Sequence, residues 1–258
     1  MDLYFKALGM HIKTSCEYKL SSIINFIAQF FVMFSDYFII IALFSKFGNI
    51  KGFTLYEILL CYSIIQLGYS INDVFFKGLD DFSDIIINGM FDRLLVRPRS
   101  LLIQILASKV SLVRTSRIIQ CIGIMIYSII NLDLELNLIK VIVLLLMIIG
   151  SVVIFFSILL LMSGLSFFTV QGLEIKSLFT YGGKQIAQYP IAIFKKYIVL
   201  FFTFVIPYGL VNYYPYLYFL GRNDNVFYAF APLGTLIFLG ISLVVFKLSS
   251  NKYVSTGS

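Results

Sequence analysis

The sequence predicts an all-α integral membrane protein with six transmembrane helices. Of its 258 residues, 60% are hydrophobic, and the chain has 27 Phe but only 13 Asp and Glu residues. A water-soluble domain of this size leaves most of its surface to polar side chains, so this composition indicates a surface that largely faces lipid. Six stretches are apolar over roughly 20 residues, the length that crosses about 30 Å of hydrocarbon. They are residues 22–45, 54–76, 109–131, 138–163, 197–220 and 229–248.

The basic residues predict the orientation of these spans. An even number of spans places both termini on the same side, and four of the 20 Lys and Arg residues then fall on the opposite side. Those four are Lys46, Lys51, Lys140 and Arg222. Because Lys and Arg accumulate in cytoplasmic loops, we expect both termini in the cytosol, and residues 1–258 as a single multi-pass domain in the cell membrane.

The first 20 residues have the pattern of an amphipathic helix. Phe5, Leu8, Ile12 and Cys16 share one helical face, while Lys6 lies elsewhere. This favours a helix lying on the inner leaflet, and a frayed polar leader is the alternative. The segment lacks the continuous apolar region and small-residue cleavage site of a signal peptide, so we expect the first span to remain as an anchor.

Few residues suit catalysis or metal binding. Cys16, Cys61 and Cys121 are scattered and form neither a disulfide framework nor a metal-binding spacing, so we interpret them as small apolar fillers. His11 is the single histidine of the chain, which argues against a His-based zinc site and a Ser-His protease. We therefore expect no enzymatic activity of its own and no directly bound cofactor or metal.

ATP binding and nucleic-acid binding are equally unsupported. The nearest approach to a Walker A loop is LFTYGGKQ, where Gly183 and Lys184 are present but Leu178 and Gln185 replace the first glycine and the Ser or Thr. The basic residues follow the inner membrane edge instead of forming one patch interleaved with aromatic residues. The remaining function classes are transport, conduction and anchoring.

Polar side chains interrupt three of the spans. They are Asp36 in the first, Gln66, Asn72 and Asp73 in the second, and Arg114 and Arg117 in the third. A charge near a helix centre costs about 2.5–3.5 kcal/mol, and such groups usually face a bundle interior or a wet path. These residues are therefore candidates for a translocation path. The alternatives are snorkelling of the two arginines to headgroups and interfacial solvation of the Asn-Asp pair.

The fifth span contains breaks. Pro207 falls in its middle, and Gly209 and Pro215 follow. Each proline removes a backbone donor, and a broken helix in lipid needs protein or water to satisfy the freed carbonyls. We predict a short re-entrant or tilted piece in the outer half, with a simple kink as the alternative. Because the chain has no Trp, an outer aromatic belt is expected from the tyrosines at 208, 213, 214, 216 and 218.

Residues 77–100 form a cytosolic connection that is too long for a turn. Acidic residues at 80, 81 and 84 suit the positive end of a helix dipole, and Gly89 is expected to stop the helix. Phe82, Ile85 and Ile86 then share one face. A second small apolar face follows at Phe91, Leu94 and Leu95, and Pro98 ends it. The exposed apolar stripe predicts a partner. The partner is either the membrane surface, attracted by Arg93, Arg97 and Arg99, or a soluble subunit.

The stretch GMFDRLLVRPRS resembles the G-(E)-(L/F)-D-x-L-L-x-(R/K)-P signature of the bacterial ABC-2 type membrane permeases, in particular a six-span subfamily. Four later stretches look like the same subfamily in the same order: SFFTVQGLEI, TYGGKQIAQYPIAIF, FVIPYGLVNYYP and YVSTGS. The resemblance covers nearly the whole chain. One departure is Met90-Phe91, where the group tends to have Glu-Leu, which removes an acid from the loop.

The resemblance implies the permease half of a type V ABC exporter, with an N-terminal elbow helix and a coupling helix in residues 77–100. Its implied partners are a cytosolic ATPase that binds ATP, a second identical or related permease, and membrane lipid. The implied coupling residues are Phe82, Ile85, Ile86, Phe91, Asp92, Arg93, Leu94, Arg97 and Pro98. Pro207, Gly209 and Pro215 would belong to an outer gate.

The expected function is ATP-driven export of an amphiphilic or hydrophobic cargo, and the outward direction comes from the resemblance. The alternative is a non-transporting membrane subunit that anchors or regulates a cytosolic partner.

Overall fold

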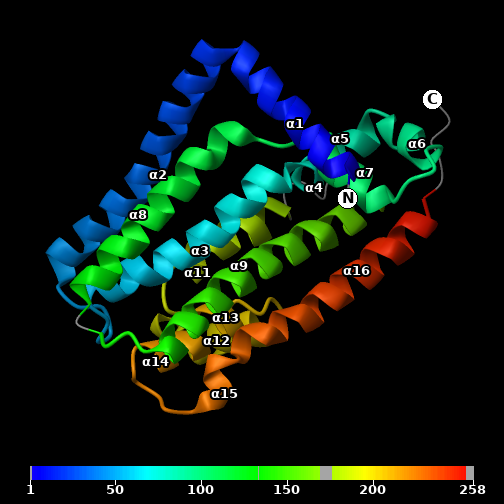
Figure 1. Ribbon diagram of the computed structural model, residues 1–258. Coiled ribbons are helices and arrows are strands. Elements are labelled where there is room, and N and C mark those ends of the chain that lie inside the picture. The colour runs from blue at the N-terminus through cyan, green and yellow to red at the C-terminus, as the bar shows by residue number, and fades with distance from the viewer. Residues whose placement is uncertain (1, 133, 169–175, 254–258) are drawn as a thin grey trace.

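The computed structural model describes residues 2–132, 134–168 and 176–253, and helices dominate these ranges. Figure 1 shows an elongated helical bundle. The longer helices are α1 (Asp2–Glu17), α2 (Lys19–Phe47), α3 (Leu55–Phe75), α8 (Thr115–Asn131), α9 (Leu138–Leu165) and α16 (Thr235–Asn251). Between α3 and α8 lie α4 (Lys77–Asp80), α5 (Phe82–Ile87), α6 (Met90–Leu95), α7 (Leu101–Ser108) and the 3-10 turn η1 (Leu112–Arg114). After α9 come the π-helical turn η2 (Leu178–Gly182), α11 (Gly183–Ala187), η3 (Ile191–Ile193), α12 (Lys196–Phe204), α13 (Gly209–Asn212), α14 (Tyr214–Phe219), α15 (Val226–Ala229) and η4 (Ala231–Gly234).

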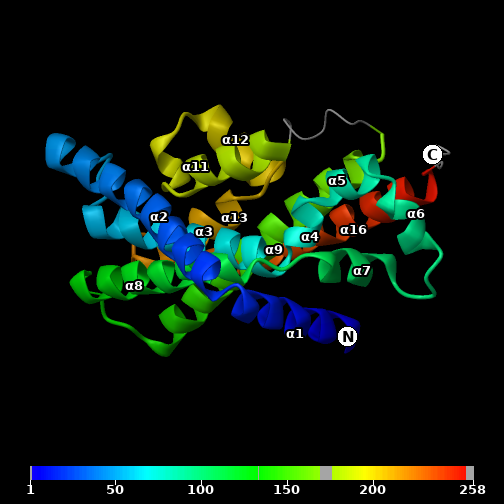
Figure 2. The same cartoon turned by 90° about the horizontal axis from the view of Figure 1, so that it is seen from above.

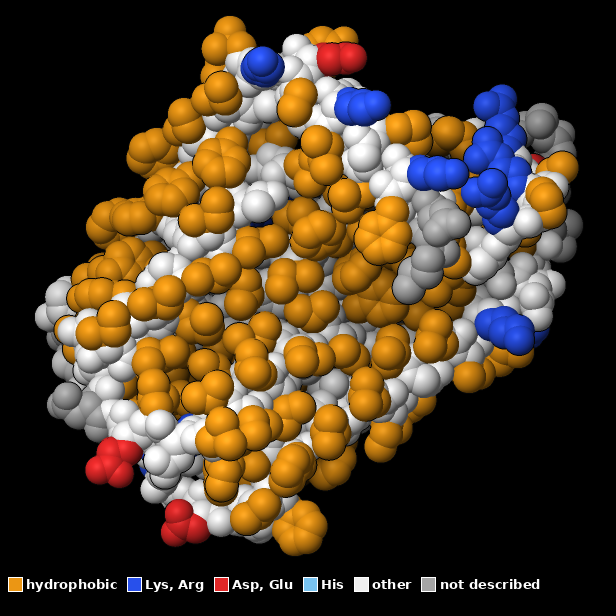
Figure 3. Space-filling view, viewed as in Figure 1, with side chains coloured by type: hydrophobic (Ala, Val, Ile, Leu, Met, Phe, Trp, Pro, Cys, Tyr) orange, Lys and Arg blue, Asp and Glu red, His pale blue; other side chains and the backbone are white. Residues whose placement is uncertain are grey.

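Five described helical segments are long and apolar enough to cross a membrane. They are Lys19–Lys46, Leu55–Phe75, Leu112–Asn131, Leu138–Leu165 and Ala231–Asn251, close to five of the six predicted spans. We call the end of the bundle that carries α4 to α7 the proximal end, and the end that carries α14 and α15 the distal end (Figure 1). In Figure 3 an almost continuous apolar surface separates a group of Lys and Arg side chains at the proximal end from the distal end.

Helix α3 is the centre of the bundle. In an 18-residue window of α3 89% of the residues are buried, against 11% in α2. Seen from above, α11 and α12 lie on one side of α3 and α9, and α1 and α8 lie on the other (Figure 2). Polar groups at the end of α3 are therefore surrounded by protein from several directions.

Small residues allow α3 and α9 to approach closely. A Cβ added at Gly68 would lie 2.7 Å from the backbone carbonyl carbon of Ser151 on α9. The Ser151 hydroxyl donates to the Ile64 carbonyl at 3.2 Å, and Asn72 Nδ2 donates to the Val152 carbonyl at 2.9 Å. Small residues and interhelical hydrogen bonds stabilise helix pairs in lipid, where the hydrophobic effect does not.

Gly68→Ala is expected to lower the free energy of unfolding by about 1–3 kcal/mol, because the added methyl must push the α9 backbone away. Gly123→Ala on α8 is the matched control, since nothing lies within 4 Å of a Cβ there. Thermal unfolding of the two solubilised variants measures the difference. Equal melting temperatures would show that the α3–α9 contact does not need glycine.

The segment 176–193 runs antiparallel to α3 along its length. Near the proximal end, Lys176 Nζ lies 2.8 Å from Asp80 Oδ1, just beyond the end of α3. Near the distal end, Lys51 Nζ, just before the start of α3, donates to the Ile193 carbonyl at 2.9 Å. The two ends of the segment therefore lie beside opposite ends of the bundle.

In the six-span prediction, the residues between spans 138–163 and 197–220 form a cytosolic connection, because their lysines are not among the four outer basic residues. This geometry corrects that expectation. Lys184 is buried beside α3, with 7% of its surface exposed. Lys195 and Lys196 come directly after the segment, at the distal end of the bundle. Part of the resembling stretch SFFTVQGLEI and most of YVSTGS lie outside the described residues.

The predicted fifth span is broken, and a simple kink is wrong. Its two halves, Lys196–Phe204 and Gly209–Phe219, meet at 101°. Pro207 lies in the break. Pro215 lies in the first turn of α14, where a backbone N–H has no partner within the helix, so its absence costs no hydrogen bond. A Cβ on Gly209 would lie 2.7 Å from Thr203 Oγ1, so the small residue permits the tight return.

Some predictions about single side chains need correction. Tyr208 and Tyr216 are buried in the protein, so they do not belong to an aromatic belt, whereas Tyr213, Tyr214 and Tyr218 are half-buried. Cys61 and Cys121 are buried apolar fillers as predicted, but Cys16 is exposed.

Helix α1 is continuous, which excludes a frayed leader. Phe5 and Ile12 of its predicted apolar face are exposed, while Leu8 of that face is half-buried. The adjacent side contacts the bundle, with Ala7 buried and the Tyr4 hydroxyl donating to the Phe75 carbonyl at 2.8 Å. Its location on the inner leaflet stays a prediction.

Candidate functional site

Residues 77–100 fold as the sequence pattern predicts, into short helices separated at glycine. Gly89 has a φ of 64°, in the left-handed region that glycine adopts without strain, and it separates α5 from α6. After α6, the Gln104 side chain donates to the Leu94 carbonyl at 3.2 Å and to the Arg99 carbonyl at 3.0 Å. These bonds hold the loop around Pro98 against α7.

Part of the apolar stripe predicted for residues 77–100 is buried in the interior of the protein. Phe82, Ile85 and Phe91 are buried. The Phe82 ring lies 5.6 Å from that of Phe91 and 6.0 Å from that of Phe246 on α16, measured between ring centroids. Phe82 and Phe91 thus pack against the chain itself and position α5 and α6, whereas Ile85 also lines the groove described below.

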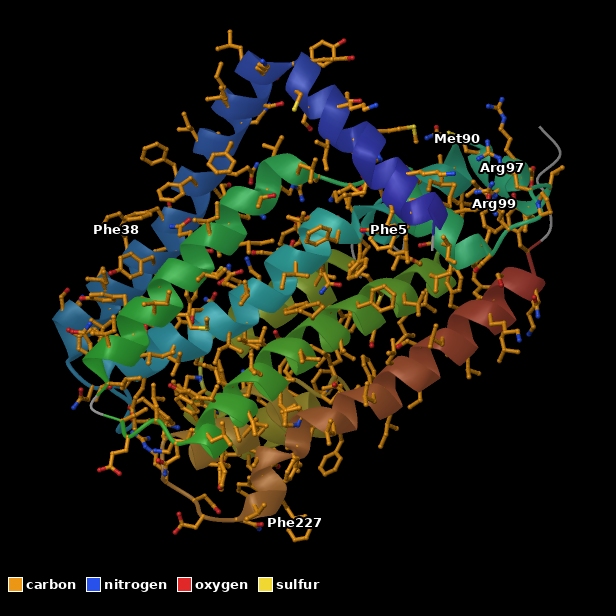
Figure 4. All side chains as sticks on the ribbon, in the orientation of Figure 1. Phe5, Phe38, Met90, Arg97, Arg99 and Phe227 are labelled. Carbon is orange, nitrogen blue, oxygen red and sulfur yellow. The ribbon has the colours of Figure 1, made fainter. Side chains whose placement is uncertain are left out.

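An exposed surface remains on the outside of α5, α6 and the following loop, and we call it the α6 surface. Its apolar members are Ile87, Met90, Leu95 and Val96, and its basic members are Arg93, Arg97 and Arg99, beside the exposed Pro98. Ile86, Asp92 and Leu94 are half-buried at its edge. Figure 4 shows Met90, Arg97 and Arg99 at the proximal end, far from Phe227 at the distal end.

A groove of about 300 Å³ lies next to the α6 surface. Its lining residues are Asp81, Asp84, Ile85, Met90, Leu94, Ser108 and Lys109. The groove is mostly apolar, with an ion pair between Lys109 and Asp81 at its wall. This combination suits the binding of a protein segment that has both apolar and charged side chains.

Asp73, near the end of α3, is the centre of a buried ion-pair cluster, which we call the Asp73 cluster. Its carboxylate binds Arg114, accepts from Arg117 Nη1 at 2.9 Å and lies 3.8 Å from Lys77 Nζ, with 2% of the side chain exposed. Arg117 also binds Gln29 on α2. Neither snorkelling of the arginines nor interfacial solvation of Asp73 describes this arrangement, because both arginines pair with a carboxylate that is buried in the protein.

Lys77 connects the Asp73 cluster to the groove. Its Nζ lies 3.3 Å from Asp81 Oδ1 and also pairs with Asp80, whose other contact is Lys176. A chain of ion pairs therefore runs from Asp81 in the groove wall through Lys77 and Asp73 to Arg117.

The pKa values near Lys77 make stability depend on pH. Burial alone raises the pKa of Asp80, but Lys176 and Lys77 outweigh it and hold the pKa below its ordinary 3.8. Burial alone lowers the pKa of Lys77, but Asp80 and Asp73 outweigh it and hold the pKa above its ordinary 10.5. The Asp80 contribution to stability is present above its ordinary pKa and is lost as the pH falls; the Lys77 contribution is present below its ordinary pKa and is lost as the pH rises.

We therefore expect a melting temperature that is level between about pH 5 and pH 9 and falls on both sides. Asp80→Asn should lower the level part and flatten the acid-side fall, whereas Asp224→Asn at an exposed position should change neither. Thermal unfolding of the solubilised protein across this pH series is the measurement. An unchanged acid-side fall in Asp80→Asn would assign it to other carboxylates.

Arg117 also lines a second cavity, of about 240 Å³, between α2, α3 and the 176–193 segment. Its lining residues are Val32, Met33, Asp36, Gln66, Arg117, Tyr181, Lys184 and Gln185, and we call it the polar cavity. Gln66 Nε2 lies 3.4 Å from Asp36 Oδ2 across it. Three predicted path residues, Asp36, Gln66 and Arg117, are thus brought together.

The three other predicted path residues have different surroundings: Asp73 is the centre of the Asp73 cluster, and Asn72 and Arg114 also lie outside the cavity lining. Asn72 Nδ2 donates to the carbonyls of Gly68 and Val152, both at 2.9 Å, so it joins α3 to α9. Arg114 binds Asp73 and does not line the polar cavity. Sequence reasoning missed Lys184 and Gln185, although the motif TYGGKQ places a charged and an amide side chain in a segment that starts beside α3.

Among the described residues, no group of three or more His, Cys, Asp or Glu side chains could hold a metal ion. A family model described as ABC-2 family transporter protein matches residues 30–257 of the chain. No curated protein and no solved structure matches it.

Proposed function

Because the chain belongs to the ABC-2 family of transporter proteins, and is thus a multi-pass permease component of an ABC transporter, we propose that it is the permease half of an ATP-driven exporter. An ABC transporter includes an ATPase subunit. On this proposal ATP binds to that partner, and the permease performs no catalysis of its own.

The observation that carries the proposal is the ion-pair chain between the groove and the polar cavity. The α6 surface and the groove supply a place where an ATPase can push. Lys77 and Asp73 then connect that place to the central helix α3 and to Arg117 at the cavity. Closure of the ATPase dimer would move α5 and α6 together with the proximal end of α3, because buried ion pairs resist separation.

The proposed orientation places the proximal end in the cytosol and the distal end outside the cell membrane. The Lys and Arg side chains gathered at the proximal end support it (Figure 3). α1 then lies on the inner leaflet as an elbow helix, with Phe5 toward lipid (Figure 4). The broken hairpin of α12 to α14, with Pro207, Gly209 and Pro215, lies at the outer side as part of a gate.

The proposed assembly pairs this permease with a second copy or a related permease, and each binds one ATPase. The cargo is amphiphilic or hydrophobic and moves outward along the interface of the two permeases. Support comes from the polar cavity, which lies beside the largely exposed apolar helix α2 and thus combines polar and apolar contact surfaces.

Reversing two charges tests the docking role. Arg93→Glu with Arg97→Glu should weaken the association with the ATPase by at least about 10-fold, while the membrane content of the permease stays unchanged. Lys247→Glu with Lys252→Glu is the matched control, because both lysines are exposed near the same end. Affinity purification of the permease with its ATPase measures the association. Wild-type recovery of the ATPase with the arginine variant would reject this docking surface.

A non-transporting anchor or regulatory subunit is the alternative. It predicts that the permease recruits the ATPase without changing its turnover. Steady-state ATP hydrolysis with and without the reconstituted permease distinguishes the two functions.

A further inference from the structure

The polar cavity contains a buried lysine that lacks a carboxylate partner. Lys184 is 7% exposed and lines the cavity. Its Nζ lies 4.9 Å from the ring centroid of Tyr69 and 5.9 Å from that of Tyr181. Within the described ranges, no acceptor lies within hydrogen-bonding distance of this ammonium group, and no carboxylate oxygen lies within 4 Å of it.

Such a charge is expensive unless something binds it. Burying an ammonium group without a hydrogen-bonding anion costs several kcal/mol. Two aromatic faces offset part of that cost, by about 1–2 kcal/mol. The other lysines near α3 behave differently, since both Lys77 and Lys176 have carboxylate partners. Lys184 is thus a free cationic donor beside an open volume.

The remaining lining favours an anion over a cation. The described lining has two cationic side chains, Lys184 and Arg117, and one carboxylate, Asp36. Arg117 uses Nη1 and Nη2 on Asp73 and Gln29, but its Nε is buried without a partner. Asp36 already accepts from Gln66. The unused hydrogen-bonding capacity at this place is mainly that of donors.

An apolar surface adjoins the cavity. Val32 lines it and is 59% exposed, and about two turns further along the same face of α2 Ile39 is 56% exposed. A ligand held by its head in the cavity could therefore lay a hydrocarbon chain along α2.

We propose that the polar cavity binds the compact anionic group, phosphate or carboxylate, of a single-chain amphiphile, and that Lys184 is its anchor. This deepens the proposed function, on which it rests, by naming the chemical class of the cargo. Gln66 and Gln185 donate further hydrogen bonds to the head. Asp36 weakens the binding and thereby permits release.

The test uses the full-length chain in nanodiscs of zwitterionic lipid and measures equilibrium binding of dodecyl phosphate. Dodecyltrimethylammonium has the same tail and the opposite charge, and inorganic phosphate has the head alone. Lys184→Gln should weaken dodecyl phosphate binding at least about 10-fold, the value of a charge-assisted hydrogen bond. Lys247→Gln, at an exposed lysine, should leave it unchanged.

Asp36→Asn gives an effect of opposite sign that misfolding cannot imitate. Removing the negative charge should strengthen dodecyl phosphate binding several-fold. Binding that is unchanged in Lys184→Gln, weakened in Asp36→Asn, or equally strong for dodecyltrimethylammonium would overturn the proposal.

The source of the anion is decided by a second nanodisc that contains anionic phospholipid. If anionic phospholipid abolishes dodecyl phosphate binding by competition, a membrane lipid is the natural occupant. If binding persists, the natural occupant is a free amphiphile. Either result is consistent with an anion-binding site in the polar cavity. Co-purification of the ATPase with the wild type and with Lys184→Gln distinguishes a failure of this inference from a failure of the proposed function. If the ATPase binds normally while dodecyl phosphate does not bind the wild type, this inference fails and the proposed function stands.

Discussion

Asp73→Asn is expected to remove most of the folded protein. The substitution leaves Arg114 and Arg117 close together without their carboxylate partner. Lys77 keeps its ion pairs with Asp80 and Asp81. Breaking a buried ion pair by removing one partner costs about 3–5 kcal/mol, which is a large part of the stability of a typical domain. The recovery of monodisperse protein and its melting temperature in detergent measure the effect.

A double variant separates charge from packing. Adding Arg114→Gln to Asp73→Asn removes one of the uncompensated cations and should restore part of the lost stability, so that the two changes are not additive. Asp224→Asn, at an exposed position, is the control and should change the free energy of unfolding by less than about 0.5 kcal/mol. If Asp73→Asn behaves like this control, the ion-pair chain cannot transmit force from the groove to α3.

Long apolar helices were the part of the fold that could be predicted from the sequence. Segments α2 and α9 are apolar over 28 residues each, so their membrane-spanning character follows from average hydropathy alone. The turn at Gly89 and the break at Pro207 were equally predictable, because glycine and proline act on the local backbone.

The segment 176–193 could not be predicted in the same way. It is divided by the π-helical turn η2 and includes Lys184 and Gln185, which lower its average hydropathy below that of a span. Its position depends on contacts with α3, such as the rings of Tyr69 and Tyr181 at 5.7 Å. Such tertiary contacts leave no periodic signal in a single sequence.

The contacts made by polar side chains could not be predicted from the sequence either. Asn72 and Asp73 are neighbours on α3, yet one joins α9 and the other joins the start of α8. The direction of each side chain follows from the rotation of the helix, which the sequence constrains, but the identity of the opposite group depends on how the helices pack. For the same reason Phe82 and Phe91 could each be placed on an apolar face but not assigned to the interior.

Tyr208→Ala is expected to loosen the hairpin of α12 to α14 from the bundle. Tyr208 is fully buried at the break of the hairpin, and its ring centroid lies 5.5 Å from that of Phe155 on α9 and 5.8 Å from that of Phe202 on α12. Its hydroxyl donates to the Phe179 carbonyl at 3.2 Å. Replacing a buried aromatic ring by alanine costs about 3–5 kcal/mol in water-soluble proteins. We expect about 3 kcal/mol here, because lipid can replace part of the lost contact.

Tyr208→Phe and Tyr197→Ala assign this loss to the ring. The phenylalanine variant keeps the packing and removes one hydrogen bond, so it should cost about 0.5–1.5 kcal/mol. Tyr197 begins the same hairpin but is 70% exposed, and its replacement by alanine should change stability by less than about 0.5 kcal/mol. Melting temperatures of the three solubilised variants should therefore fall in the order Tyr197→Ala, Tyr208→Phe, Tyr208→Ala. Equal melting temperatures of Tyr208→Ala and Tyr197→Ala would show that aromatic contacts do not hold the break in the hairpin. The hydrogen bond between Asn212 and the Ala187 carbonyl would then be the principal contact that holds it.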